Sequence, residues 1–116
     1  MLTWIILSCL VLSWANLKEA NFQWSTLKKV NLIGADLRGA DLKFTSSNQA
    51  NLKEANLNGA DLLAAHLSGA DLGWTDLKGA NLQNTNLEGA HLRGAKLQNA
   101  DLEGAIAEFR VFCTVG

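Results

Sequence analysis

A leucine recurs at every fifth position in residues 31–42, whose sequence is NLIGADLRGADL. An α-helix turns about 100° per residue, so a step of five residues turns it by about 140° and spreads the leucines around the helix. In a flat strand the side chains alternate between two faces, so an odd step would place successive leucines on opposite faces. A period of five therefore excludes both a regular helix and a flat strand.

The period of five extends over most of the chain. Residues 15–104 follow the pattern A-(N/D)-L-x-x without an insertion or a deletion. Of these 18 pentads, 17 have Leu or Phe at the centre, and the exception is Ser47. An unbroken repeat of this kind indicates an architecture in which identical units pack on their neighbours.

The pattern has a simple geometric solution. If the chain turns by about a right angle once per pentad, every central Leu points toward one axis, four pentads close a square coil, and coils stack about 4.8 Å apart. The Ala two positions earlier also points inward and must be small, because it lies beside a neighbouring Leu. Asn and Asp suit a position next to a corner, where a short side chain bonds the local backbone. Gly recurs at the last position, where a tight corner requires it.

On these residues the sequence resembles the pentapeptide-repeat family, over about three quarters of the chain. The resemblance implies an all-β fold, a right-handed quadrilateral β-helix of about 4.5 coils with four pentads per coil. Residues 15–104 then form the β-helix, after an apolar N-terminal segment, residues 1–14, and before a C-terminal segment, residues 105–116. The Leu-centred pattern is similar to family members that are abundant in photosynthetic bacteria, many without an assigned activity.

The N-terminal residues 1–15, MLTWIILSCLVLSWA, have two interpretations. As a secretory signal they have an apolar centre and a small-x-small site ending at Ala15, although no Lys or Arg precedes the apolar run. As a cap they continue the repeat, since Trp4, Trp24 and Phe44 lie 20 residues apart and would stack along one edge of a four-pentad coil. The first interpretation predicts export to a periplasm or thylakoid lumen, and the second predicts a cytoplasmic protein.

The C-terminal segment, AIAEFRVFCTVG, alternates apolar and polar residues as a strand with one apolar face does. A β-helix has open ends, so we expect this strand to cap one end or to pair with its copy in a homodimer. Cys9 and Cys113 lie near opposite ends of the expected helix, roughly 22 Å apart, so we predict no disulfide between them.

A polar patch interrupts the apolar positions at Thr45 and Ser47. One interpretation is a notch that binds a ligand. The other is a tolerated variation in which both hydroxyls bond the backbone or a water molecule, and the ease of local bonding favours it.

Candidate catalytic residues are few. Asp41 and Asp61 lie 20 residues apart and should stack in adjacent coils, and paired carboxylates at that distance can transfer protons. The same column has Asn or Asp throughout, however, as the repeat requires, which favours a solvated ladder. His66 and His91 fall on different faces without Cys or carboxylate partners at ligand spacing. Since no phosphate loop or nucleophile elbow appears either, we predict a protein that is not an enzyme, without cofactor, metal or small-molecule substrate.

A rigid rod with a patterned surface suits a protein-interaction scaffold with an unidentified protein partner. The candidate contact residues are Trp24 and Phe44 on one edge, with Leu63 nearby, and Trp74 on another edge, because exposed aromatic residues often anchor interfaces. The alternative for these side chains is packing against the N-terminal segment.

The alternative function comes from the family resemblance: quinolone-resistance members resemble DNA in shape and charge and bind DNA gyrase. Duplex DNA carries one charge per about 1.7 Å, so a mimic of 22 Å needs roughly a dozen net negative charges. This chain has a formal net charge of −1 and carries Lys18, Arg38 and Lys78 along one edge, and only Phe22 among its central residues is aromatic. These features disfavour the mimic, and basic residues interspersed with acids predict no nucleic-acid partner.

Overall fold

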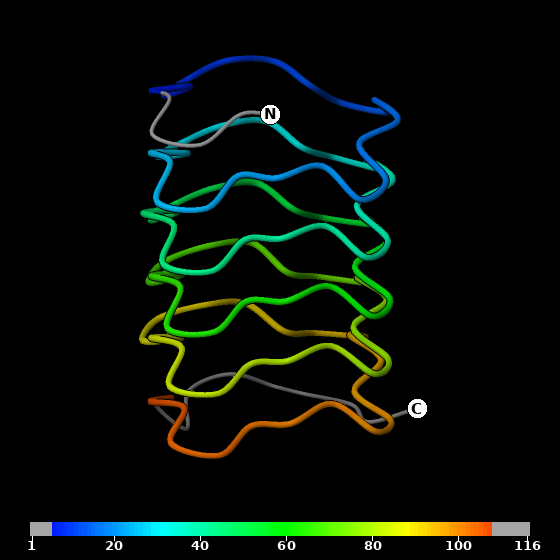
Figure 1. The fold of residues 1–116 in the computed structure, drawn as a ribbon, viewed down its shortest axis with the longest axis vertical. Helices are drawn as coiled ribbons and strands as arrows, with labels where there is room; N and C mark the ends of the chain where they lie inside the picture. The colour runs from blue at the N-terminus through cyan, green and yellow to red at the C-terminus, as the bar shows by residue number, and fades with distance from the viewer. Residues whose placement is uncertain (1–5, 108–116) are drawn as a thin grey trace.

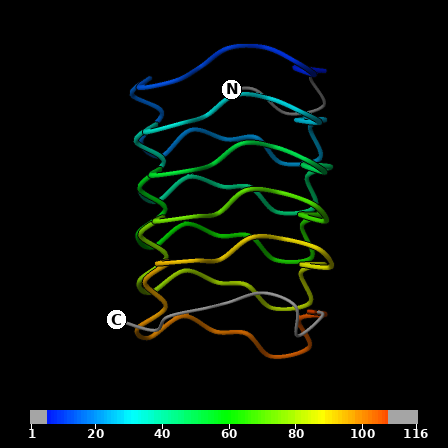
Figure 2. The ribbon, with the colours of Figure 1, turned by 180° about the vertical axis from the view of Figure 1, so that it is seen from behind.

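The computed structural model of the chain describes residues 6–107. These residues form a β-helix whose coils stack along one axis, as the two opposite views show (Figures 1 and 2). No α-helix occurs in residues 6–107, and the strands are single-residue bridges at every fifth residue from Ile6 to Ile106. In the same residues, no helix is long and apolar enough to cross a membrane.

The bridges confirm that four pentads make one coil. Each joins parallel residues 20 positions apart, from Ile6 with Thr26 to Asn86 with Ile106. The described ladder therefore spans about five coils, half a coil more than the expected 4.5. The addition comes from residues 6–14, since Leu7 and Leu12 pack against the core like the later leucines.

Parts of both terminal segments lie outside the described residues. Trp4, which the sequence places in a stack with Trp24 and Phe44, is one of these residues. So is most of the C-terminal strand, after Ala107, with its expected capping or dimerisation role.

Backbone hydrogen bonds hold the coils at a fixed spacing. In a typical pentad, the amide of Leu32 donates to the carbonyl of Asn51 in the next coil at 2.8 Å, and the amide of Gly34 donates to the carbonyl of Lys53 at 2.9 Å. A further bond closes the corner, from the amide of Ala35 to the carbonyl of Leu32 at 3.0 Å. Because the main chain makes these bonds, the outward side chains can vary without changing the frame.

The corners explain the recurrent glycines. The last residue of each described pentad has a positive φ, as in a type II turn, for example +65° at Gly34 and +63° at Trp24. Glycine adopts this conformation at no steric cost, whereas an L-residue pays about 1 kcal/mol. The expected need for a special corner conformation is therefore confirmed, and non-glycine residues, including three tryptophans, adopt it as well.

The inward and corner-adjacent residues behave as the pattern predicts. Central leucines such as Leu37 and Leu57 and the preceding alanines such as Ala35 are buried in one continuous core. The Asn and Asp side chains bond the local backbone: Asn31 Oδ1 accepts from the amide of Ile33 at 3.1 Å, and Asp41 Oδ1 accepts from that of Lys43 at 3.1 Å. These bonds stabilise the approach to each corner.

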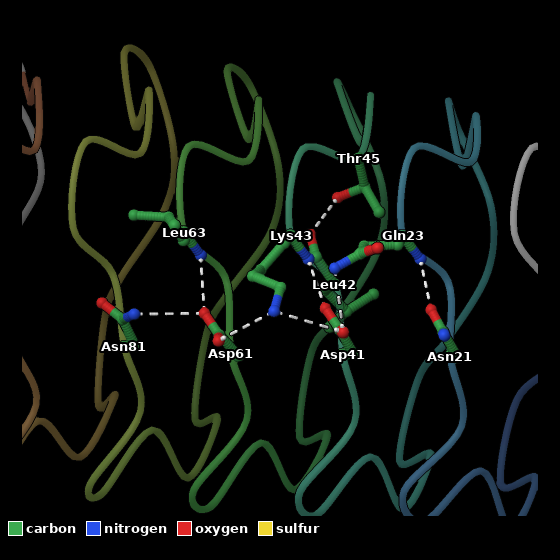
Figure 3. Close-up of polar contacts among 9 residues, drawn as sticks. All are labelled: Asn21, Gln23, Asp41, Leu42, Lys43, Thr45, Asp61, Leu63 and Asn81. Carbon is green, nitrogen blue, oxygen red and sulfur yellow. Dashed lines mark hydrogen bonds and ion pairs between the residues drawn. The ribbon is translucent and has the colours of Figure 1, made fainter.

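The polar patch in the core is satisfied internally. Ser47 is 3% exposed, and its Oγ donates to Thr45 Oγ1 at 3.0 Å. Thr45 Oγ1 in turn donates to the carbonyl of Leu42 at 2.9 Å (Figure 3). The interpretation that these hydroxyls are bonded locally is thus confirmed.

Candidate functional site

Residues at one corner form columns that run along the axis of the β-helix. Since one coil is 20 residues, Trp24 is followed in its column by Phe44 and then by Ala64. Leu63 precedes Ala64 in the same coil. We call Trp24, Phe44 and Leu63 the aromatic edge.

The two rings of the aromatic edge stack as the sequence predicts. Their centroids lie 4.3 Å apart and their planes differ by 12°. Trp24 is 48% exposed, while Phe44 and Leu63 are partly buried. A stack held by backbone in the αL conformation on both coils presents a large apolar surface with little freedom to move, which is the property of an interface anchor.

A polar ladder lies beside the aromatic edge (Figure 3). Lys43 Nζ is 3.5 Å from Asp41 Oδ2 and 3.8 Å from Asp61 Oδ2, so one ammonium lies between the two stacked carboxylates. Gln23 Nε2 donates to Asp41 Oδ2 at 3.2 Å, and Asn81 Nδ2 donates to Asp61 Oδ1 at 3.1 Å. The two carboxylates are therefore joined through cationic and amide donors along a partly exposed surface, as expected of a solvated ladder.

Trp74 lies on a different edge from Trp24. It is 59% exposed, and its ring covers Gly94 of the next coil: a Cβ added to Gly94 would lie 2.6 Å from Trp74 Cδ2. The structure thus brings Trp24, Phe44 and Leu63 into one region and separates Trp74 from them, as the sequence predicts.

A further exposed aromatic residue is not among the predicted contacts. Trp14 is 70% exposed and covers Gly34 in the same way that Trp74 covers Gly94. Trp14 and Trp74 share a column, because they are 60 residues, or three coils, apart. That spacing is a signal in the sequence, but a boundary at residue 14 hides it by placing Trp14 in the terminal segment rather than in a coil.

The two histidines lie on the surface. Both are exposed, with His66 paired to Ser46 and His91 paired to Asp71 in the ladder of bridges. The expectation that neither histidine has a carboxylate partner is therefore wrong for His91, whose neighbour in the adjacent coil lies 20 positions earlier. In residues 6–107 no group of three or more His, Cys, Asp or Glu side chains could hold a metal ion.

The basic residues of one edge have acidic neighbours. Arg38 Nη2 lies 2.6 Å from Asp36 Oδ2, and Lys78 Nζ lies 3.8 Å from Asp76 Oδ2. The hydrogen bonds from Arg38 lower the pKa of Asp36 from 3.8 to about 2, and they raise the pKa of Arg38. This edge is therefore a mixed surface rather than a uniformly charged one.

Comparison with known proteins agrees with this architecture. The pentapeptide-repeat family model matches residues 5–45, 48–84 and 72–106, with eight copies. The chain belongs to the pentapeptide-repeat family, and its fold is a right-handed quadrilateral β-helix. No curated protein matches the sequence.

Solved structures of the family are similar to the chain. The pentapeptide repeat protein Rfr23 of the cyanobacterium Cyanothece 51142 has 27% identity and a TM-score of 0.92, with 97% of this chain and 90% of Rfr23 covered. The pentapeptide repeat protein alr5209 of Nostoc Pcc 7120 has 37% identity and a TM-score of 0.65, with 76% and 84% covered. The plasmid-mediated fluoroquinolone resistance protein QnrB1 has 20% identity and a TM-score of 0.41, with 86% and 61% covered, which supports no functional inference.

Proposed function

We propose that the protein is a non-catalytic interaction scaffold that binds a protein partner through the aromatic edge. The observation that carries this proposal is the stacked pair Trp24 and Phe44, held 4.3 Å apart with half of the Trp24 surface exposed. Aromatic side chains supply most of the energy of many interfaces, particularly where they are rigid before binding. Leu63 extends this surface by one coil, and Trp74 is a separate candidate contact on another edge.

The surroundings of the stack also suit an interface. The polar ladder of Asp41, Lys43 and Asp61 lies beside it, and such polar groups at a rim favour the correct orientation of a partner. The cross-coil backbone bonds would keep both parts in place during binding, so little ordering of the scaffold opposes association.

The test uses variants that the backbone accepts. Ala64 occupies the same column as Trp24 and Phe44, with φ of +55°, so the double variant Trp24→Ala and Phe44→Ala should keep its fold. Glu54→Ala is the matched control, because Glu54 is an exposed corner residue with φ of +61° on another edge. Circular dichroism verifies that each variant is folded.

Tagged wild-type and variant chains are incubated with lysate of the source cells, and captured proteins are quantified by mass spectrometry. A candidate partner is then purified and its Kd for each chain is measured. We expect the double variant to bind at least tenfold more weakly, since each anchor residue is worth more than about 1 kcal/mol, and Glu54→Ala to bind like the wild type. Equal binding of all three chains would contradict the assignment of the contact, and Trp74→Ala tests the second edge in the same assay.

A further inference from the structure

A hollow of about 430 Å³ lies on a part of the surface that the proposed interface does not use. It extends over three successive coils, each of which contributes the last two residues of one pentad. The side chain of Ser68 and the bare backbone of Gly69 leave room beside the longer side chains of the two preceding coils. Its lining residues are Lys28, Lys29, Asn48, Gln49, Ser68 and Gly69.

The charge of this hollow is uniformly positive. It has two lysines and no carboxylate among its lining residues, and Glu88 follows Ser68 only in the next coil. Over the part of the chain that the structure describes, ion pairs engage Arg38 and two lysines on other faces, and neither Lys28 nor Lys29 takes part in one. Both ammonium groups are therefore available to a ligand.

Hydrogen-bond acceptors around the hollow are largely occupied. The carbonyl of Asn48 accepts from the amide of Lys29 at 3.1 Å, and the carbonyl of Ser68 accepts from the amide of Gln49 at 2.9 Å. Asn48 Oδ1 accepts from Ser46 Oγ at 3.1 Å. Ser68 Oγ accepts from Asn48 Nδ2 at 2.5 Å, so its own proton remains free to donate.

From this combination we infer that the hollow binds a phosphate-type oxyanion. Two ammonium groups match a double negative charge, and the Ser68 hydroxyl and Gln49 amide can donate to further oxygens of the same group. The anion can be free phosphate or a phosphorylated side chain of a protein, because both present the same oxygens. This site is independent of the aromatic edge and goes beyond the proposed function.

The first measurement is a titration of the ¹⁵N-labelled chain, followed by amide chemical shifts. Sodium phosphate is compared with sodium chloride at equal ionic strength. We expect saturable shifts at the amides of Lys29, Gln49 and Gly69 with a low-millimolar Kd for phosphate and no saturable shift with chloride. Identical responses to the two salts would overturn the inference, since they would reflect screening alone.

Two sets of variants test the chemistry. In the first, Lys28→Gln and Lys29→Gln are combined; Gln23 and Gln49 already occupy the equivalent pentad positions, so the fold should persist. The matched control is Lys53→Gln, an exposed lysine on another face. We expect the double variant to bind phosphate at least tenfold more weakly and the control to be unchanged, and equal binding by both would overturn the site.

The second set adds a carboxylate to the hollow. Ser68→Glu should abolish phosphate binding, whereas Asn58→Glu, the same charge change at the same pentad position on another face, should leave it unchanged. Retained binding by Ser68→Glu contradicts the site. A peptide Gly-Gly-phosphoserine-Gly-Gly and its unphosphorylated form then identify the source: tighter binding of the phosphopeptide than of inorganic phosphate assigns the site to a phosphorylated partner, and the reverse order assigns it to the free anion.

Discussion

Replacing Gly94 by alanine tests how the corner tryptophans are held. The ring of Trp74 covers Gly94, and an added Cβ would lie 2.6 Å from Trp74 Cδ2, far inside van der Waals contact. Gly79 is the control, because it has a similar φ of +68° and an added Cβ there would meet nothing within 4 Å. Both substitutions place an L-residue in the left-handed region, and only one also displaces a tryptophan.

The expected costs differ by a measurable amount. The left-handed conformation costs alanine about 1 kcal/mol in either variant. Trp74 is 59% exposed, so about two fifths of its surface is covered. If the ring swings away, roughly 100 Å² of apolar contact at about 25 cal/mol per Å² is lost, or at most about 2.5 kcal/mol. We therefore expect Gly94→Ala to cost about 3 kcal/mol and Gly79→Ala to cost about 1 kcal/mol.

Urea unfolding followed by circular dichroism measures both free energies. A double-mutant cycle with Trp74→Ala isolates the contact, because without the indole Gly94→Ala should cost only the backbone term of about 1 kcal/mol. Equal destabilisation by the two glycine variants, or no coupling to Trp74, would refute the inference that the ring rests on Gly94.

Three further predictions follow from the core, the charges and the surface. Leu57→Ala should lower the free energy of unfolding by about 2–5 kcal/mol, because Leu57 is fully buried, whereas the exposed neighbour variant Asn58→Ala should change it by less than about 0.5 kcal/mol in urea unfolding. Asp36 should titrate at about pH 2 in a carboxyl ¹³C experiment and return toward 3.8 in Arg38→Gln; since its pKa is lowered by folding, its stabilising contribution is present above pH 3.8 and is lost as the pH falls through 2. The chain should not protect DNA gyrase from a quinolone in a supercoiling assay, because its formal net charge of −1 is far from that of a DNA mimic, and protection at submicromolar protein would contradict this argument.

The period of five is sufficient to predict the frame. The inward Leu and Ala, the Asx bonds and the positive φ at the corner each follow from one pentad. The spacing of 20 then places Trp24 against Phe44 from the sequence alone, because residues in one column must be neighbours when the coil has four pentads.

Features that depend on side chains in different coils are harder to predict. Whether a corner tryptophan stacks or lies flat depends on the residue 20 positions later: Phe44 gives a stack with Trp24, and Gly94 gives a flat ring at Trp74. The hollow beside Lys28 and Lys29 exists because Ser68 and Gly69 are small two coils away, so the two lysines alone do not reveal it.

The central claim is that Trp24 and Phe44 form an exposed stack on adjacent coils of a four-pentad helix. Nuclear Overhauser effects between the two rings in the complete chain, together with acrylamide quenching of a chain in which Trp24 is the only tryptophan, test this claim most directly. The account predicts strong contacts between the Trp24 and Phe44 rings, none between Trp24 and Trp74, and an indole that acrylamide reaches. Absence of the ring contacts, or a Trp24 indole fully shielded from the quencher, would contradict it.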